Sequence, residues 1–212
     1  MESERVFSMS DFYEFSSCGY MTTFAASADE FERCLSFGDG SAGDRFYSKL
    51  ILGDYKDIHM PVTYREMGYG ASGKKMRDIL DTRFHQLCLI SDRFRRILED
   101  TGMTGWKSYP IVLYDRKGNQ IKGYNGFSVV GRAGKMQKYE TPPIEMGYSP
   151  ESSGYHFDIK TWDGSDLFIT EGSWHVIASK QFIKLLVENK ITACKYCSLT
   201  DYGDWSKIKR LH

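Results

Sequence analysis

The apolar positions of this chain follow strand and helix spacing in two stretches that resemble each other. In the first stretch, the apolar run 85–91 predicts a buried strand, and residues 92–102 predict a helix that Ser91 is placed to cap. The apolar side chains on one face of this helix are Phe94, Ile97 and Leu98. The sequence WKSYP, which follows the helix, predicts the next strand. Strand, cap, helix and strand together make one structural unit.

The same order of elements returns 88 residues further along the chain, from Ser91 to Ser179. The aligned pairs are Phe94 with Phe182, Ile97 with Leu185, Leu98 with Leu186 and, after a connection one residue shorter in the second copy, Tyr109 with Tyr196. An internal repeat is the first signal to look for in a sequence, because it fixes the architecture. Two copies are too few for a solenoid, so the repeat predicts a duplicated core.

The pattern as a whole predicts an α/β fold of the α+β kind, with a mixed, largely antiparallel sheet and helices. Two pseudo-repeated strand-helix-strand units are expected at about 85–130 and 155–200, within a duplicated core of residues 76–212. Residues 1–75 are expected to form a strand, helix and loop region that packs on this core. The chain has 212 residues, which suits one compact domain with a sizeable core.

Local signals predict further elements between these units. The expected elements are a strand within 1–28, a helix at 29–38, a glycine-rich loop at 61–75, a short helix at 76–84, two strands around a turn at 117–119, a linker at 133–154 and a hairpin that turns at Asp163-Gly164. The last residues, from about 201, are expected to form a polar and basic tail.

Charge is balanced over the chain but unevenly distributed. The 28 basic and 28 acidic residues give a formal net charge of zero, which argues against a general nucleic-acid-binding protein. Residues 65–138 carry 15 basic and 7 acidic side chains, whereas residues 1–64 carry 5 and 11. This distribution favours segments that fold against one another. A charged face that binds a partner is the alternative interpretation.

The chain lacks the signals of export. Its first residues, MESERVFSMS, do not match a secretory signal, and no apolar run is long enough to span a bilayer. The five cysteines are odd in number and irregular in spacing, which is typical of reduced thiols. We therefore expect a cytoplasmic location and no membrane partner.

The pair Cys194-x-x-Cys197 has the spacing of a metal-binding or redox motif. A zinc site needs four ligands, and the sequence has no second pair of this kind to complete it. The first copy of the repeat carries Lys107 and Pro110 near the equivalent places, so the unit forms without cysteines. We expect buried thiols, no metal and no cofactor, with a redox role as the alternative.

Two other classes of function stay open. A hydrolase that uses His156 or His175 would need a partner for the histidine from elsewhere in the fold, and no Gly-x-Ser-x-Gly motif supports it. A nucleic-acid-binding module would use the basic stretch 65–138 and would show steep salt dependence. Neither class has a motif in its favour, which shifts the interpretation towards a protein that binds another protein.

Three motifs give the sequence a resemblance to a known family. They are a Ser-capped helix after an apolar strand at Ser91, a D-x-x-G turn and following strand at Asp115–Gly118 and Tyr124–Val129, and the closing unit Gly164–Leu185. Over roughly residues 80–200 the chain resembles the immunity-protein-eleven family of bacterial polymorphic toxin systems. The resemblance implies a cytoplasmic protein, encoded beside a toxin, that protects its producer by binding that toxin stoichiometrically. It carries no catalytic residues over to this chain.

Aromatic and acidic residues in the expected loops and tail are the candidates for the toxin-binding surface, because tyrosine and tryptophan dominate binding hot spots. The candidates are Tyr64, Tyr69, Trp162, Asp163, Asp166, Tyr202, Asp204 and Trp205. Each of them has a packed or solvated structural role as its alternative.

Overall fold

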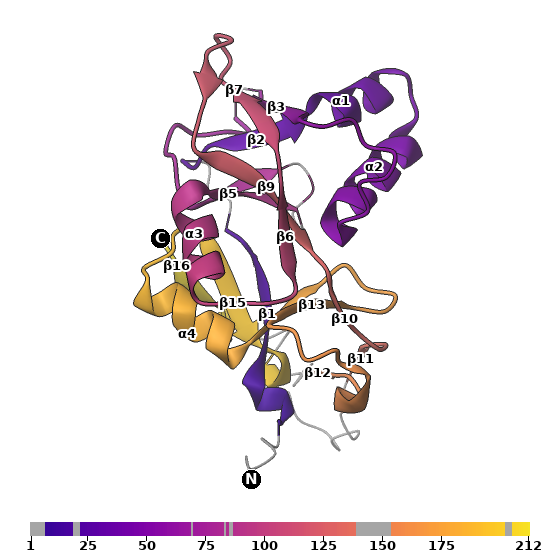
Figure 1. Ribbon diagram of the computed structural model, residues 1–212, viewed down its shortest axis with the longest axis vertical. Coiled ribbons are helices and arrows are strands. Elements are labelled where there is room, and N and C mark those ends of the chain that lie inside the picture. Colours follow the sequence, from indigo (N-terminus) through magenta and orange to yellow (C-terminus); the bar gives the residue numbers. More distant parts are fainter. Residues whose placement is uncertain are drawn as a thin grey trace, which may run out of the picture.

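The computed structural model describes residues 7–18, 22–68, 70–82, 84, 87–138, 154–201 and 205–212 (Figure 1). The helices are α1 (Asp29–Ser36), α2 (Gly40–Leu52), α3 (Asp92–Asp100) and α4 (Lys180–Glu188), with short 3-10 turns η1 (Met9–Asp11), η2 (Ile159–Thr161), η3 (Leu199–Asp201) and η4 (Trp205–Lys207). The strands are β1 (Phe12–Ser17), β2 (Ala25–Ala28), β3 (Val62–Glu66), β4 (Ile79–Thr82), β5 (Cys88–Ser91), β6 (Trp106–Tyr109), β7 (Ile111–Tyr114), β8 (Gln120–Ile121), β9 (Tyr124–Val129), β10 (Gly131–Ala133), β11 (Gln137–Lys138), β12 (Tyr155–His156), β13 (Leu167–Thr170), β14 (Val176–Ser179), β15 (Cys194–Ser198) and β16 (Lys209–Leu211).

Most of these strands form two large sheets. The first sheet has eight strands in the order β6-β9-β5-β4-β2-β3-β7-β8, and the second has six in the order β10-β13-β14-β1-β15-β16. Strands β11 and β12 form a separate ribbon. Parallel pairing joins β2 to β4, β3 to β7 and β10 to β13, and the other pairs are antiparallel. The predicted α+β fold with largely antiparallel pairing is confirmed, with two sheets in place of one.

The predicted duplication is visible in both sheets. The elements β4, β5, α3 and β6 correspond to β13, β14, α4 and β15, and each pair starts 88 residues apart (79 to 167, 88 to 176, 92 to 180, 106 to 194). Helices α3 and α4 lie next to each other, with the rings of Phe94 and Phe182 6.4 Å apart (Figure 1). Even the backbone after each helix matches, since Gly102 and Lys190 both have positive φ, at 67° and 51°.

In each sheet, a strand that is not part of the repeat lies between the two strands that flank the repeated helix in sequence. In the second sheet, β1 lies between β14 and β15, and in the first sheet β9 lies between β5 and β6. From β1 the chain crosses to the first sheet as β2, and from β9 it crosses to the second sheet as β10. The N-terminal region is therefore divided between the two sheets, and both sheets contain strands from distant parts of the chain.

Two aspartates tie the units to each other. Ser91 caps α3 by accepting a hydrogen bond from the Phe94 amide (3.1 Å), and its hydroxyl donates to Asp78 Oδ1 (2.9 Å). The other oxygen of Asp78 accepts from the amide and the hydroxyl of Thr192, which follows the helix of the second unit (3.2 and 3.1 Å). One carboxylate thus fixes its own helix cap and the connection of the opposite unit.

The second unit makes the same contacts in return. Ser179 caps α4 through the Phe182 amide (3.2 Å) and donates to Asp166 Oδ1 (2.9 Å). Asp166 Oδ2 accepts from the amide and the hydroxyl of Thr104, which follows the helix of the first unit (both 3.0 Å). Because the exchange is reciprocal, each unit is held by a residue that the other unit supplies.

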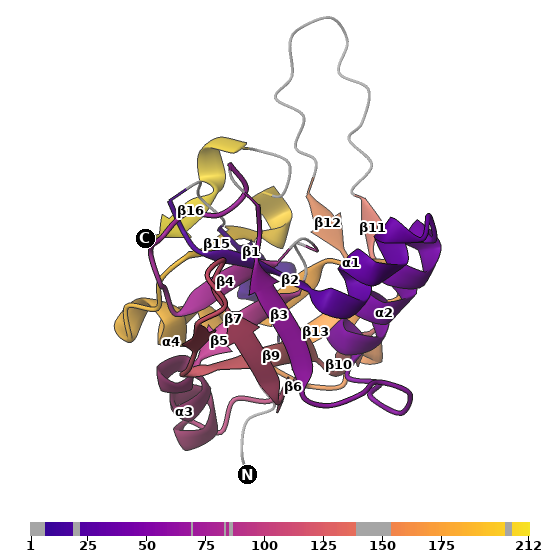
Figure 2. The same cartoon turned by 90° about the horizontal axis from the view of Figure 1, so that it is seen from above.

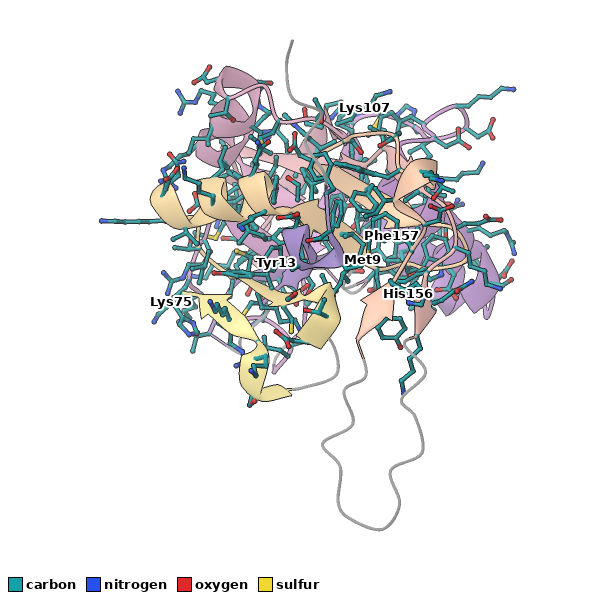
Figure 3. The ribbon with its side chains drawn as sticks, turned by 90° about the horizontal axis from the view of Figure 1, so that it is seen from below. Met9, Tyr13, Lys75, Lys107, His156 and Phe157 are labelled. Carbon is teal, nitrogen blue, oxygen red and sulfur yellow. The ribbon has the colours of Figure 1, made fainter. Side chains whose placement is uncertain are left out.

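The outer faces of the two sheets are covered differently. Helix α2 packs on β9 and buries Tyr47, Leu50 and Ile51 against the first sheet. The second sheet is covered by a cluster of aromatic rings, in which Phe12 and Phe157 are 5.1 Å apart (Figure 3). The first covering is two helices inserted between β2 and β3, and the second comes from the segments before β1 and around β12.

Several local predictions were wrong. Residues 76–84 contain strand β4 where a helix was expected. A run of four residues is too short to distinguish helical from strand spacing, and the pairing with β2 and β5 decides for the strand. The expected loop 61–75 contains β3, and its alternating buried positions were hidden by the glycines that follow. No hairpin forms at Asp163-Gly164, because β13 pairs with β10 and β14. Most of the expected linker 133–154 lies outside the described residues.

The alignment of the two closing strands also needs correction. Tyr109 pairs with Gly126 on β9, and Cys197 pairs with Glu14 on β1, at equivalent places in the two sheets. The offset therefore stays at 88 residues through the connection, and Tyr109 corresponds to Cys197, not to Tyr196. The alignment of Tyr109 with Tyr196 had required a connection one residue shorter in the second copy, and the two connections are in fact equal in length.

We expect Asp166→Ala to lower the free energy of unfolding by about 2–4 kcal/mol, because it removes the acceptor of three hydrogen bonds and leaves their donors unpaired. Chemical denaturation followed by circular dichroism measures this. Asp100→Ala, which removes an exposed carboxylate at the end of α3, is the control and should change the value by less than about 0.5 kcal/mol. Equal effects of the two variants would contradict the proposed role of the network.

Candidate functional site

Four of the predicted binding residues, Tyr64, Trp162, Asp163 and Asp166, have side chains that the structure describes. Tyr69, Tyr202 and Asp204 lie outside the described residues, as does the side chain of Trp205 at the start of η4. Tyr64 was predicted on a loop, but it lies on β3 and is completely buried. Its position there is wrong for a contact residue, because alternate residues of this strand point into the core.

Tyr64 has a structural role instead. Its hydroxyl forms a hydrogen bond of 2.8 Å with the hydroxyl of Tyr109, which is also buried. Burial raises the pKa of both phenols well above the ordinary value. The pair therefore stays neutral and satisfies two polar groups inside the core.

Trp162, Asp163 and Asp166 are engaged within the fold. Asp163 accepts from the Arg132 amide (2.7 Å) and from the amide and hydroxyl of Ser165 (3.0 and 2.5 Å). The half-buried Trp162 donates its indole N–H to the Ser165 carbonyl (2.9 Å), and its ring packs in the aromatic cluster on the second sheet. Together with the bridging role of Asp166, these contacts give the three residues a structural role, which was the alternative for each of them.

The histidines of the hydrolase alternative lie on different elements, His156 on β12 and His175 directly before β14. His175 Nδ1 lies 3.9 Å from Glu14 Oε1, which is beyond hydrogen-bond distance. His156 lies half-buried on β12, close to Phe157 (Figure 3). Neither histidine is among the residues that line the groove between α1 and the segment before β3.

The cysteine pair is part of the core. Cys194 and Cys197 both lie buried on β15, and Cys88 is buried on the neighbouring face of the first sheet. Burial raises the pKa of Cys88 and Cys194 above the ordinary thiol value. Among the described residues, no group of three or more histidine, cysteine or acidic side chains is placed to hold a metal ion.

The feature of the surface that the fold does not explain is the α1–α2 arm, residues 29–52, which projects from one side of the molecule (Figure 1, Figure 2). The arm is rigid at its base, where the rings of Phe31 and Tyr47 stack 4.5 Å apart. Gly43 permits this close packing, because a Cβ there would lie 2.7 Å from the Phe31 ring. The tip is different, since Phe37 is 80% exposed and Leu35 is 39% exposed.

A groove of about 390 Å³ lies between the arm and the segment that leads into β3. Its lining residues are Asp29, Glu30, Arg33, Phe46, Asp57, Ile58, His59, Pro61, Val62 and Thr63. The apolar residues among them form a surface next to three carboxylates. Each carboxylate has a basic neighbour, which is Arg65 for Asp29 (2.9 Å), Arg33 for Glu30 (2.6 Å) and Lys49 for Asp57 (2.8 Å). These pairs are largely exposed.

The sequence contained a signal for the arm that the prediction did not use. The helix at 29–38 was expected and is confirmed as α1, but α2 was not singled out, because its apolar positions are interrupted by Gly40, Gly43 and Asp44. Phe37 follows the last turn of α1 and precedes Gly38, which has a φ of 75°. A large apolar residue beside a turn glycine, outside the helical stripe, indicates exposure.

We expect the free energy of unfolding to fall as the pH rises above about 10. The unfolded tyrosines ionise near pH 10, whereas Tyr64 and Tyr109 have raised pKa values in the folded protein, so their contribution is complete below that pH and is lost above it. Denaturation between pH 8 and 11 should show a shallower decline in Tyr64→Phe. Identical slopes for the variant and the unchanged protein would contradict this assignment.

We also expect the thiols to differ in reactivity. At pH 8 the native protein should show at most one rapidly reacting thiol, Cys34, because the other four cysteines are buried. All five should react after unfolding in guanidinium. Counting thiols with a chromogenic disulfide reagent measures both values, and a fast reaction at Cys194 or Cys197 in the native state would revive the redox alternative.

No helix among the described residues combines the length and the apolar character that crossing a membrane requires. No protein-family model matches the sequence, and no curated protein matches it either. The candidate site is therefore defined by the geometry of the arm, with its exposed tip and the groove at its base.

Proposed function

We propose that this protein is an immunity protein that neutralises a cognate bacterial toxin by stoichiometric binding, and that the α1–α2 arm belongs to the contact surface. The observation that carries the proposal is the 80% exposure of Phe37 at the tip of the arm. Exposed aromatic side chains are typical of binding hot spots. The resemblance to the immunity-protein-eleven family supplies the class of partner.

The position of the arm in the duplicated fold supports this assignment. Between β2 and β4 the first unit contains α1, α2 and β3, whereas between β10 and β13 the second unit contains the β11–β12 ribbon. The elements that occur in both units form the shared core. The α1–α2 arm occurs in one unit alone, so the core does not require it, and it can contact a partner as long as it is held in place. Burial of Tyr47, Leu50 and Ile51 anchors this one.

The groove indicates the chemistry of the contacting segment of the toxin. A lysine or arginine side chain has an apolar stem and a cationic end, which match the apolar surface and the carboxylates of the groove. Exposed ion pairs contribute little to stability, so the pairs around Asp29, Glu30 and Asp57 can exchange for a partner's cation at low cost. We propose a basic residue of the toxin in the groove and an apolar one against Phe37.

The nucleic-acid alternative rests on the excess of basic residues in the stretch 65–138. Four of its arginines already pair with carboxylates. These pairs are Arg65 with Asp29, Arg93 with Asp78, Arg95 with Glu99, and Arg116 with Glu66. The stretch keeps its excess of basic over acidic residues, 15 against 7, so the salt dependence of any binding to DNA or RNA tests this alternative.

We expect Phe37→Ala to weaken the complex with the product of the adjacent gene by about 30-fold or more, which corresponds to the loss of a hot-spot residue. Isothermal titration of the two purified proteins measures the affinity, and co-expression of the toxin measures protection. The matched control is Val187→Ala, which truncates an apolar residue that is 45% exposed on α4, a helix on the side of the molecule away from the arm (Figure 2). It should bind and protect fully.

Two results would contradict this prediction. Full affinity and protection by Phe37→Ala would remove the arm from the interface, and the absence of any complex would remove the immunity function itself. A change in self-association of the free protein, with unchanged affinity for the toxin, would show that the arm joins two copies of this chain.

A further inference from the structure

The two sheets share an order of strands, and they differ at the edge of β6. In the second sheet the order β10, β13, β14, β1 and β15 repeats the order β2, β4, β5, β9 and β6 of the first, and the first pair is parallel in both. The second sheet then continues with β16, which pairs with the outer edge of β15. Among the described residues, the first sheet ends at β6 (Figure 1).

The strands β6 and β15 match in their backbone as well as in their place. Gly105 and Ala193 precede them at equivalent positions, and both have positive φ, at 81° and 66°. The carbonyl of Gly105 accepts a hydrogen bond from the Val130 amide (2.8 Å), and the carbonyl of Ala193 accepts one from the Cys18 amide (2.9 Å). The edge of β6 therefore has the geometry of the edge to which β16 pairs.

The outer edge of β6 is open to a further strand. Because hydrogen bonding alternates along an antiparallel pair, the backbone groups of Trp106 and Ser108 point away from β9. These two residues are half-buried and Lys107 is exposed, whereas Cys194 and Tyr196, at the equivalent places beside β16, are buried. An edge strand with outward N–H and C=O groups is a template for pairing with another chain.

The charge of Lys107 restricts which strand fits this edge. Full antiparallel overlap with β6 of a second copy would set Lys107 opposite Lys107. The β16 strand of a second copy would place Arg210 there, as β16 does opposite Lys195. Like charges directly opposite each other destabilise a strand pair, and an edge lysine is a common means of preventing self-association. A strand with a carboxylate at this place replaces the repulsion with attraction.

We propose that the edge of β6 binds an extended segment of the cognate toxin as an antiparallel strand, an inference that rests on the proposed function. The segment has an acidic residue opposite Lys107 and an apolar residue opposite Trp106, the place that Leu211 takes opposite Cys194. In such a strand addition, main-chain hydrogen bonds supply affinity and alternate side chains supply specificity. Helix α2 of the arm packs on β9, the neighbour of β6, so one partner can contact both the arm and this edge.

Hydrogen exchange at single amides tests the strand addition. It is measured by NMR on the full chain, alone and in complex with the purified product of the adjacent gene. We expect the amides of Trp106 and Ser108 to exchange about tenfold or more slowly in the complex, because new hydrogen bonds protect them. The amide of Gln120, on β8 at the opposite end of the same sheet, is the internal control and should change by less than about threefold.

Variants of the edge test the same contact by affinity, measured by isothermal titration. Ser108→Pro removes an outward N–H from an edge strand, where proline is tolerated, and should weaken the complex by about tenfold or more. Its matched control, Ser108→Ala, keeps the N–H and should change the affinity by less than about threefold.

Charge reversal tests the acidic residue of the partner strand. Lys107→Glu should weaken the complex by about fivefold or more, because it sets like charges opposite each other. Lys184→Glu makes the same change of charge on α4 and is the control, with an expected change of less than about twofold.

Three outcomes would overturn the proposal. A complex in which Trp106 and Ser108 exchange as in the free chain, or in which Ser108→Pro binds as tightly as Ser108→Ala, overturns it and leaves the proposed function standing. Slower exchange of these amides in the free chain as its concentration rises would show that two copies pair there instead. The absence of any complex removes the proposed function and this inference together. Circular dichroism identifies a misfolded variant, and the exchange measurement, which uses the unchanged protein, then decides alone.

Discussion

The reciprocal hydrogen bonds of Asp78 and Asp166 are the contacts on which the arrangement of this protein depends. Each carboxylate has two oxygens with different tasks, one for the serine that caps its own unit's helix and one for the threonine of the other unit. A shared carboxylate converts a local helix cap into a long-range tie. The two units therefore cannot shift relative to each other without breaking the start of a helix.

The hydrogen bonds of Asp78 and Asp166 show which residues hold the fold together and which ones remain free to contact another molecule. Asp166 and Trp162 looked like binding residues in the sequence because they are an acid and an aromatic near a turn, and both are needed inside the fold. The arm lies outside the repeated elements, and the apolar side chains at its tip are exposed. Phe37 at the tip of the arm is 80% exposed. An exposed aromatic side chain that the packing of the fold does not need is typical of a surface that binds a partner.

The sequence predicted what depends on local spacing. The structure contains the capped helices at Ser91 and Ser179 and the strands before them, which follow from local patterns. Comparison of these two short stretches also predicted the repeat, whose copies lie 88 residues apart. It did not predict what depends on distant partners. Strand β4 was taken for a helix because its neighbours come from residues far away, and Tyr64 was taken for a surface residue because its partner Tyr109 lies on another strand. For the candidate site, Phe37 was within reach of sequence reasoning, whereas the groove forms from segments that only the fold brings together.

The crossing of β1 into the second sheet has a consequence for how the chain folds. Strand β1 begins at residue 12, and its neighbours β14 and β15 begin at residues 176 and 194. During synthesis, the first strand to emerge therefore waits for nearly the whole chain before its hydrogen bonds can form. Such long loop closure slows folding and leaves an apolar strand exposed in the meantime, since Phe12 and Phe15 are buried once the sheet is complete. The same strand makes the finished protein resistant to partial opening, because the second sheet cannot lose its centre without releasing the N-terminal segment.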